Sequence, residues 1–227
     1  MSGPLAKRFA GRRDAGRQLA AVLAPLAEER PVVIGLPRGG VPVAEEVALA
    51  LRAPLEVLAV RKLGAPHNPE YGIGAIAEDD TRVFDSSALA ALGIDADALE
   101  EIVAAETMEL HRRVEAYRGE RERLPLEGRT AIVIDDGVAT GVTDTAALRA
   151  VRRGRPARLI LAVPVCARDS VDRLREEADE VVCLIEPRLL RGVGQWYEDF
   201  SQVSDDEVLA ALARAEGRSP PSGGIGS

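Results

Sequence analysis

The stretch RTAIVIDDGVATGVTDTAALRAVR, residues 129–152, holds an apolar run that ends in two acids and a loop of small residues. The run at 130–135 has the continuous apolar, β-branched character of a strand that is buried on both faces. After Asp135 and Asp136 come glycine and hydroxylated residues, and from Asp144 the pattern is that of a helix. The stretch therefore predicts a strand, a tight loop and a helix in direct succession.

Other segments repeat this alternation of buried strand and helix. Because strands and helices alternate along the chain, the pattern predicts an α/β fold with a parallel sheet. A helix over 14–29 is also expected, with Asp14 as its N-cap and Pro25 as an interruption. The further strands are expected at 31–36, 55–60, 157–165 and 180–186, and the further helices at 41–51, 144–153 and 167–178.

The interval 61–129 departs from the alternation. It contains a Gly/Pro-rich segment at 63–72, expected to be a loop, and a short hairpin at 73–84. A helix near 97–118 follows, because apolar residues recur at helical spacing. Its apolar face holds Leu99, Ile102, Val103, Leu110, Val114 and Tyr117. An insertion of this length between strands is often functional.

Composition narrows the class of protein. The chain has 227 residues, 46% of them hydrophobic, and a net charge of −8, which disfavours nucleic acid and anionic membrane as partners. Cys166 and Cys183 lie in apolar strand-like runs and are expected to be buried and reduced. No signal peptide or run of 18 apolar residues is found, so a cytoplasmic protein is expected.

The two acids and the loop after them predict the chemistry of a ligand. Ligands of open α/β sheets bind where strands end, and residues 139–143 would offer amides and hydroxyls to a phosphate at a helix N-terminus. Asp135 and Asp136 suit the hydroxyls of a ribose or a bound Mg²⁺, so a ribose 5-phosphate group is predicted. A P-loop ATPase is disfavoured because the chain lacks the required lysine motif, and GIGAIA at 72–77 is interpreted as a chance match to a dinucleotide fingerprint. The alternative is an acidic turn without a ligand.

The segment AIVIDDGVATGVT, residues 131–143, closely resembles the phosphoribosyl-pyrophosphate (PRPP) binding motif of type I phosphoribosyltransferases. The resemblance implies a three-layer open, mainly parallel sheet with a flexible loop insertion that covers the site and a small C-terminal hood. It suggests a single domain over 1–216, with the insertion at 63–128 and the hood at 187–210. The Gly/Pro/Ser-rich tail at 217–227 is expected to be disordered.

The same resemblance assigns residues to the pyrophosphate end of PRPP. Pro37, Arg38, Gly39 and Gly40 of LPRGG match the loop that binds pyrophosphate through amides and a basic side chain, with a cis peptide expected between Pro37 and Arg38. Arg61 and Lys62 are expected at the end of the second strand, where their charge would offset that of the leaving group. His67 and His111 are interpreted as non-catalytic.

The remaining assignments concern the phosphate loop and the hood. Ala139, Thr140, Gly141, Val142 and Thr143 would hold the 5-phosphate. In the hood, Trp196, Tyr197 and Phe200 either stack on an acceptor base or form a small apolar core, and both alternatives stay open.

The implied reaction is transfer of the ribose 5-phosphate group of PRPP to a nitrogen acceptor, such as a nucleobase, with release of pyrophosphate. Asp135, Asp136, Arg38 and Lys62 are the predicted catalytic residues, with Mg²⁺ as cofactor, held by the two acids through water, and a homodimer as one expected assembly. Some family members carry a third acid where this chain has Ala139, so neither the general base nor the acceptor is identified. The alternatives are a regulatory protein that binds PRPP or a nucleotide without turnover and, less favoured, a nucleotide hydrolase.

Overall fold

The computed structural model describes residues 8–66, 68–119 and 121–217. Five strands form one parallel sheet in the order β2-β1-β6-β7-β8. Its strands are β1 (Val32–Gly35), β2 (Leu55–Val57), β6 (Thr130–Ile134), β7 (Arg158–Val165) and β8 (Glu180–Ile185). All five expected strands are therefore present, and the predicted mainly parallel α/β architecture is confirmed.

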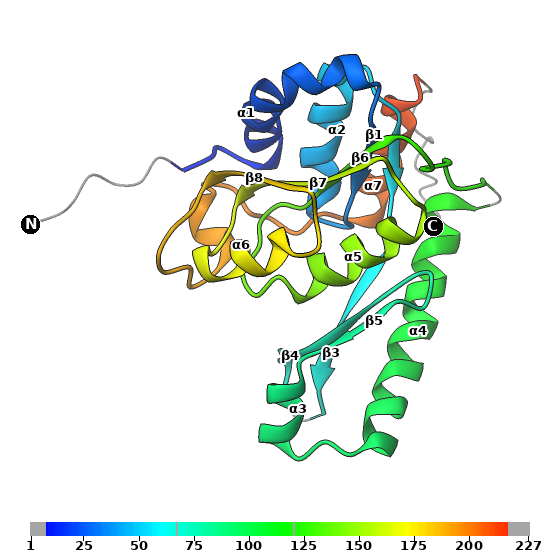
Figure 1. The fold of residues 1–227 in the computed structure, drawn as a ribbon, viewed down its shortest axis with the longest axis vertical. Helices are drawn as coiled ribbons and strands as arrows, with labels where there is room; N and C mark the ends of the chain where they lie inside the picture. Colours follow the sequence, from blue (N-terminus) through cyan, green and yellow to red (C-terminus); the bar gives the residue numbers. More distant parts are fainter. Residues whose placement is uncertain (1–7, 67, 120, 218–227) are drawn as a thin grey trace, which may run out of the picture.

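Helices cover both faces of this sheet (Figure 1). One face packs on α1 (Arg12–Leu23), α2 (Gly40–Leu51) and α7 (Asp205–Ala215). The opposite face packs on α5 (Val142–Arg153) and α6 (Arg168–Arg175). Because side chains alternate along a strand, neighbouring residues of β1 such as Val33 and Ile34 enter different cores. The result is three layers, with β6 in the middle of the sheet.

The N-terminal helix differs from expectation in its N-cap, and β8 differs from the central strands in its burial. The helix predicted over 14–29 is α1 followed by the 3-10 helix η1 (Ala24–Glu29), which has Pro25 in its first turn. The N-cap of α1 is Gly11 rather than the predicted Asp14. The carboxylate of Asp14 instead accepts a hydrogen bond from the Ala10 amide. Strand β8 is only half-buried because it lies at the edge of the sheet.

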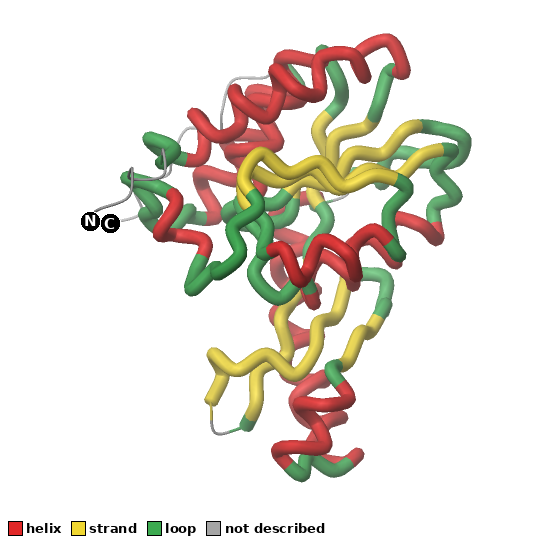
Figure 2. The backbone as a smooth tube through the Cα atoms, turned by 60° about the vertical axis from the view of Figure 1, so that its left-hand side comes forward, coloured by secondary structure: helices red, strands yellow, loops and turns green. Residues whose placement is uncertain are grey.

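The interval between β2 and β6 forms a separate lobe, visible below the main sheet in Figures 1 and 2. Three strands make an antiparallel sheet in the order β3-β4-β5, and two helices pack on it. The elements are β3 (Val60–Ala65), β4 (Asn68–Ala77), β5 (Arg82–Phe84), α3 (Ser86–Leu92) and α4 (Ala96–Arg118). The prediction of a loop at 63–72 is wrong, because this segment belongs to the β3–β4 hairpin.

Small residues explain why that hairpin was not recognised in the sequence. A Cβ on Gly72 would lie 2.7 Å from Cε of Lys62, and one on Gly74 would lie 2.5 Å from the Val83 carbonyl oxygen. At Gly74 the neighbour is backbone, so glycine is required there by close approach, whereas at Gly72 the Lys62 side chain could move aside. In the sequence, the abundance of glycine nevertheless favours a loop. The predicted hairpin over 73–84 is confirmed as β4 and β5, which places GIGAIA inside a strand.

The expected apolar face of α4 is also confirmed. Leu99, Ile102, Val103, Leu110 and Val114 pack on the lobe sheet, while Tyr117 reaches the core of the main sheet. Among the described residues, no helix combines the length and apolar character that a membrane span requires. Most of the expected tail, 218–227, lies outside the described residues.

Candidate active site

The two acids of the sequence motif lie where β6 ends, at the carboxyl edge of the main sheet. The chain then turns through Gly141, which has a left-handed φ of 74°, and enters α5. A left-handed backbone conformation at this position favours glycine, because glycine has no Cβ. The first amides of α5 have no partner within the helix and can serve an anion. The predicted order of acids, small-residue loop and helix N-terminus is thus confirmed.

The glycine pair of LPRGG lies directly against the two acids. A Cβ on Gly39 would overlap Oδ2 of Asp136, and one on Gly40 would lie 2.8 Å from Cα of Asp135. The predicted cis peptide between Pro37 and Arg38 is present. The Gly40 amide donates to the Leu36 carbonyl at 3.0 Å, so it closes the turn in this structure. The predicted pyrophosphate loop and the predicted ribose acids therefore form one surface.

Asp136 is also held from the N-terminal and C-terminal segments of the chain. Nε of Arg12 donates to its Oδ2 at 2.7 Å, and the hydroxyl of Tyr197 donates to its carbonyl oxygen at 2.5 Å. The two acids are poorly solvated, and burial is the largest cause that raises the pKa of each carboxyl. For Asp135 the neighbouring charges of Asp136 and Asp144 add to this rise in pKa, whereas the Arg12 guanidinium opposes it for Asp136.

Tyr197 belongs to a small apolar cluster. It is 3% exposed, and its ring centroid lies 5.4 Å from that of Phe9 and 5.0 Å from that of Phe200. Trp196, in the 3-10 helix η2 (Val193–Trp196), packs on the same cluster. Tyr197 and Trp196 thus lie in an apolar core, while Phe200 is 36% exposed, and the contact of these aromatics with an acceptor base stays a prediction.

Two side chains of α6 hold the predicted phosphate loop from behind, and sequence reasoning missed both. Ser170 donates to the Ala139 carbonyl at 2.7 Å, and Arg173 donates to the Thr140 carbonyl at 2.9 Å. These two bonds reinforce the conformation of the loop between β6 and α5. The available signal was a serine and an arginine three positions apart on the helix after the strand next to β6.

The basic residues predicted for pyrophosphate are less closely associated with the acids. Strand β2 ends at Val57, so Arg61 and Lys62 are in β3 of the lobe and not at the end of the second strand. Arg61 forms an ion pair with Glu106 of α4, with Nη2 and Oε2 2.6 Å apart. Arg38 extends toward Asp205 at the start of α7, at 3.9 Å. The predicted position of Arg61 and Lys62 at the end of the second strand is therefore wrong. Their place after β2 in the sequence does not show that the chain has already left the main sheet and entered the lobe.

The remaining predicted residues have simple positions. Val142 and Thr143 open α5, with Thr143 half-buried. His111 is exposed on α4, and His67 lies outside the described residues. Cys166 is buried and Cys183 half-buried, and both are free thiols.

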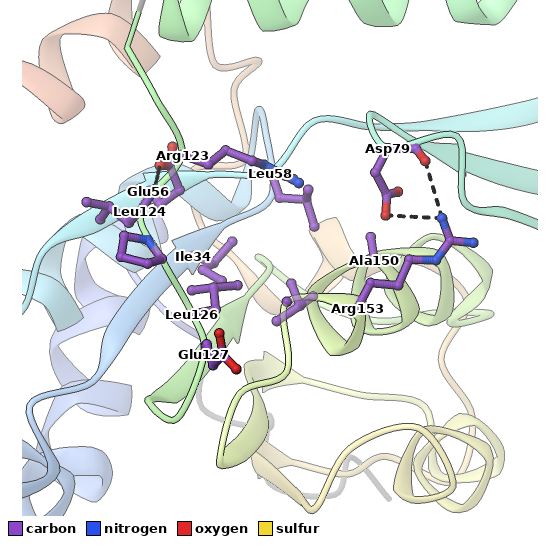
Figure 3. Close-up of a pocket in the computed structure, with 13 residues that line it drawn as sticks. Ile34, Glu56, Leu58, Asp79, Arg123, Leu124, Leu126, Glu127, Ala150 and Arg153 are labelled. Atoms are coloured by element: carbon purple, nitrogen blue, oxygen red, sulfur yellow. Dashed lines mark hydrogen bonds and ion pairs between the residues drawn. The ribbon is translucent and has the colours of Figure 1, made fainter.

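Cavities alone do not identify this site. A cavity of about 470 Å³ lies between β1, β2, the linker at 123–127 and the far end of α5, away from both acids (Figure 3). Its floor includes Ile34 and Leu58, and its rim carries an ion pair between Arg153 and Asp79. A second cavity of about 320 Å³ does reach Thr140 and Gly141. The convergence of the loops, rather than the size of a hollow, therefore defines the candidate site.

Comparison with known proteins decides the family. The model of the phosphoribosyl transferase domain matches residues 12–206, which include the acids, both loops and the whole lobe. The chain belongs to the phosphoribosyltransferase family. It is 51% identical over 209 residues to a Mycobacterium tuberculosis protein named "Putative phosphoribosyl transferase", and the match covers 92% of this chain. The match covers 47% of that relative, so this chain spans about half the length of the curated protein.

A solved structure supports the fold of this family member. The crystal structure of a Thermus thermophilus protein is 45% identical and superimposes with a TM-score of 0.75. The match covers 91% of this chain and 98% of the Thermus chain. The similarity thus extends over the lobe as well as the parallel sheet.

Proposed function

We propose that the protein transfers the ribose 5-phosphate group of PRPP to a nitrogen acceptor and releases pyrophosphate. The observation that carries the proposal is the packing of Gly39 against Asp136 and of Gly40 against Asp135. This packing joins the loop assigned to pyrophosphate with the acids assigned to ribose. The start of α5 lies shortly beyond Asp136 in the chain, and its free amides would bind the 5-phosphate.

In this reaction the acceptor nitrogen attacks C1 of the ribose, and the bond from C1 to the pyrophosphate oxygen breaks. Pyrophosphate leaves with the electron pair, and the proton on the acceptor nitrogen passes to a base or to solvent. Positive charge develops on the ribose, so the carboxylates of Asp135 and Asp136 would stabilise the transition state and bind the ribose hydroxyls. Thr140, Gly141 and Thr143 would hold the 5-phosphate, and Arg38 with the Gly39 amide would face pyrophosphate.

Mg²⁺ fits this donor set as an ion carried in with PRPP. Mg²⁺ commonly binds one or two carboxylates together with substrate phosphates and water. In the described part of the chain, no group of three or more His, Cys, Asp or Glu side chains is placed to hold a metal by itself. Asp135 and Asp136 would therefore bind the ion through water, and the bound Mg²⁺ would neutralise charge on the leaving pyrophosphate.

The proposal is tested by mixing the protein with PRPP, Mg²⁺ and a panel of purines, pyrimidines and simple amines. Release of pyrophosphate together with a ribosylated product, identified by mass spectrometry, is expected for at least one acceptor. Binding of PRPP without release across the panel would favour the regulatory alternative. Phosphate release from nucleotides without PRPP would favour a hydrolase.

The first variant to test is the double substitution Asp135→Asn with Asp136→Asn. Amides cannot supply the same pair of charged acceptors, so Mg²⁺-dependent PRPP affinity is expected to fall by roughly a hundredfold. Calorimetry measures the affinity, and circular dichroism confirms that the variant is folded. Unchanged affinity in a folded double variant would contradict the assignment of the acids.

A further inference from the structure

Arg12 makes a contact with the candidate site that its position in the sequence does not suggest. It opens α1, 124 residues before its partner, yet its Nε donates to Oδ2 of Asp136 at 2.7 Å. The side chains of Arg12 and Asp136 are only 11% and 14% exposed. Solvent therefore screens this pair much less than a pair on the surface.

The guanidinium of Arg12 is fixed at two further points, both in the C-terminal hood. Its Nη1 donates to the Ser201 carbonyl at 2.8 Å. Its central carbon lies 3.9 Å from the centroid of the Phe200 ring, a cation–π contact. A planar guanidinium can satisfy all three partners at once, which a point-charge ammonium cannot.

The contact also determines how Asp136 is presented. Arg12 binds Oδ2, Tyr197 binds the main-chain carbonyl, and a Cβ on Gly39 would lie 3.2 Å from Nε of Arg12. The Asp136 carboxylate is thus enclosed by the helix start, the hood and the glycine loop. Its Oδ1 is the oxygen that the Arg12 bond leaves for another donor.

We propose that Arg12 is a positioning residue for the phosphoribosyl transfer suggested above. It fixes the rotamer of Asp136 so that the second carboxylate oxygen accepts a ribose hydroxyl of PRPP. The inference rests on the proposed function and extends it, because it makes the N-terminal segment and the hood part of the sugar subsite. Arg12 itself need not touch the substrate.

The test compares Arg12→Gln and Arg12→Lys with the control Arg17→Gln. Arg17 lies on the same helix, is 59% exposed, and forms ion pairs only at 3.9 Å. Calorimetry with PRPP and Mg²⁺ is expected to show about a tenfold loss of affinity for Arg12→Gln. Arg12→Lys keeps the charge but not the planar contacts, so it is expected to lose at least about threefold. The control is expected to bind like the wild type.

A double-mutant cycle separates positioning from general stability. If Arg12 acts through Asp136, Arg12→Gln combined with Asp136→Asn binds PRPP no more weakly than Asp136→Asn alone. Additive losses would overturn the proposal, as would wild-type or tighter binding by a folded Arg12→Gln. Should Arg12→Gln fail to fold, wild-type affinity in Arg12→Lys would overturn it instead. A wild type that neither binds PRPP nor releases pyrophosphate would overturn the proposed function, and this inference with it.

Discussion

At the scale of single residues, the candidate site depends on glycines, which have no side chain, as much as on its acids. Gly39 and Gly40 allow one loop to touch the acids of another, and Gly141 allows the turn into α5. A Cβ on Gly40 would meet backbone atoms, and a Cβ on Gly39 would meet the Asp136 carboxylate, which Arg12 holds in place. Small changes here are therefore expected to affect binding more than their size suggests.

Gly39→Ala is expected to weaken PRPP binding by roughly tenfold or more, because overpacking of this kind typically costs about 1–3 kcal/mol. The new methyl group would displace the Asp136 carboxylate and disturb its bond to Arg12. Gly192→Ala is the matched control, since nothing lies within 4 Å of its Cβ position and its φ is an ordinary extended one at 175°. Equal PRPP affinity in the two variants would contradict the packing.

Asp144 is expected to make stability depend on pH. It is 4% exposed in the first turn of α5, and its Oδ1 has no hydrogen-bond partner among the described residues. Burial raises the pKa of this carboxyl to about 7. An unfolded aspartate has a pKa of about 3.9, so between about pH 4 and pH 7 the folded state binds more protons.

The sign follows from that difference in proton binding. The contribution of Asp144 is most favourable below the unfolded pKa, decreases as pH rises to about 7, and is constant above it. Asp144→Asn removes the titration, so its melting temperature is expected to fall less than that of the wild type between about pH 5 and pH 8. Scanning calorimetry across this range measures both slopes. Parallel curves for the two proteins would show that the carboxyl is not neutral in the fold.

How much of the site was predictable depends on sequence distance. Asp135, Asp136 and the loop after them were predicted because acids, loop and helix start are contiguous in the chain. The cis bond at Pro37 followed from the resemblance. Arg12 was missed because only the tertiary fold brings the start of α1 to the end of β6. Residues that are close together in the sequence could thus be predicted as one candidate site. The contact of Arg12 with Asp136 follows only from the packing of distant segments.

At the scale of elements, buried strands were predicted more reliably than exposed or glycine-rich ones. The central strands β1, β6 and β7 are apolar apart from the first residues of β6 and β7, Thr130 and Arg158, and burial on both faces explains this composition. The hairpin of β3 and β4 was missed because Gly, Pro and Asn in LGAPHNPEYG are typical of turns. Helix α6 was predicted, but its contacts with the loop after β6 were not. These contacts join the segment after β7 to the segment after β6, which are about 30 residues apart in the sequence.

Ser170→Ala combined with Arg173→Gln is expected to weaken binding of PRPP and ribose 5-phosphate by about tenfold. Each bond to a loop carbonyl contributes roughly 0.5–1.5 kcal/mol, and both hold the same loop. Arg175→Gln is the control, because Arg175 is 57% exposed and, among the described residues, pairs only with Asp172 of its own helix at 3.3 Å. Calorimetry with both ligands measures the effect. If control and double variant bind equally, α6 does not organise the loop.

At the scale of the whole molecule, the long helix α4 connects the lobe with the main sheet (Figure 1). A buried acid adds a second connection. Glu78, just after β4, is paired through Oε1 with Arg118 at 2.7 Å and Arg123 at 2.6 Å. Its Oε2 accepts a bond from the amide of Ala59 at 3.0 Å. The side chain is 4% exposed, so one carboxylate ties the lobe to both linkers that lead into the main sheet.

Glu78→Ala is expected to destabilise the protein by about 3–5 kcal/mol, because removal of one partner leaves Arg118, 13% exposed, without its shorter ion pair. Glu127→Ala is the control: that glutamate is 67% exposed and pairs with an arginine that is 76% exposed, so a loss below about 1 kcal/mol is expected.

Denaturant titration measures the free energy of unfolding of both variants, and hydrogen exchange shows where in the structure stability is lost. Since Glu78 joins the lobe to its linkers, amides of β3 and β4 should exchange faster in Glu78→Ala, while those of β6 and β7 change only with global stability. Uniform acceleration across both sheets would mean that lobe and main sheet unfold as one unit and that Glu78 stabilises them together.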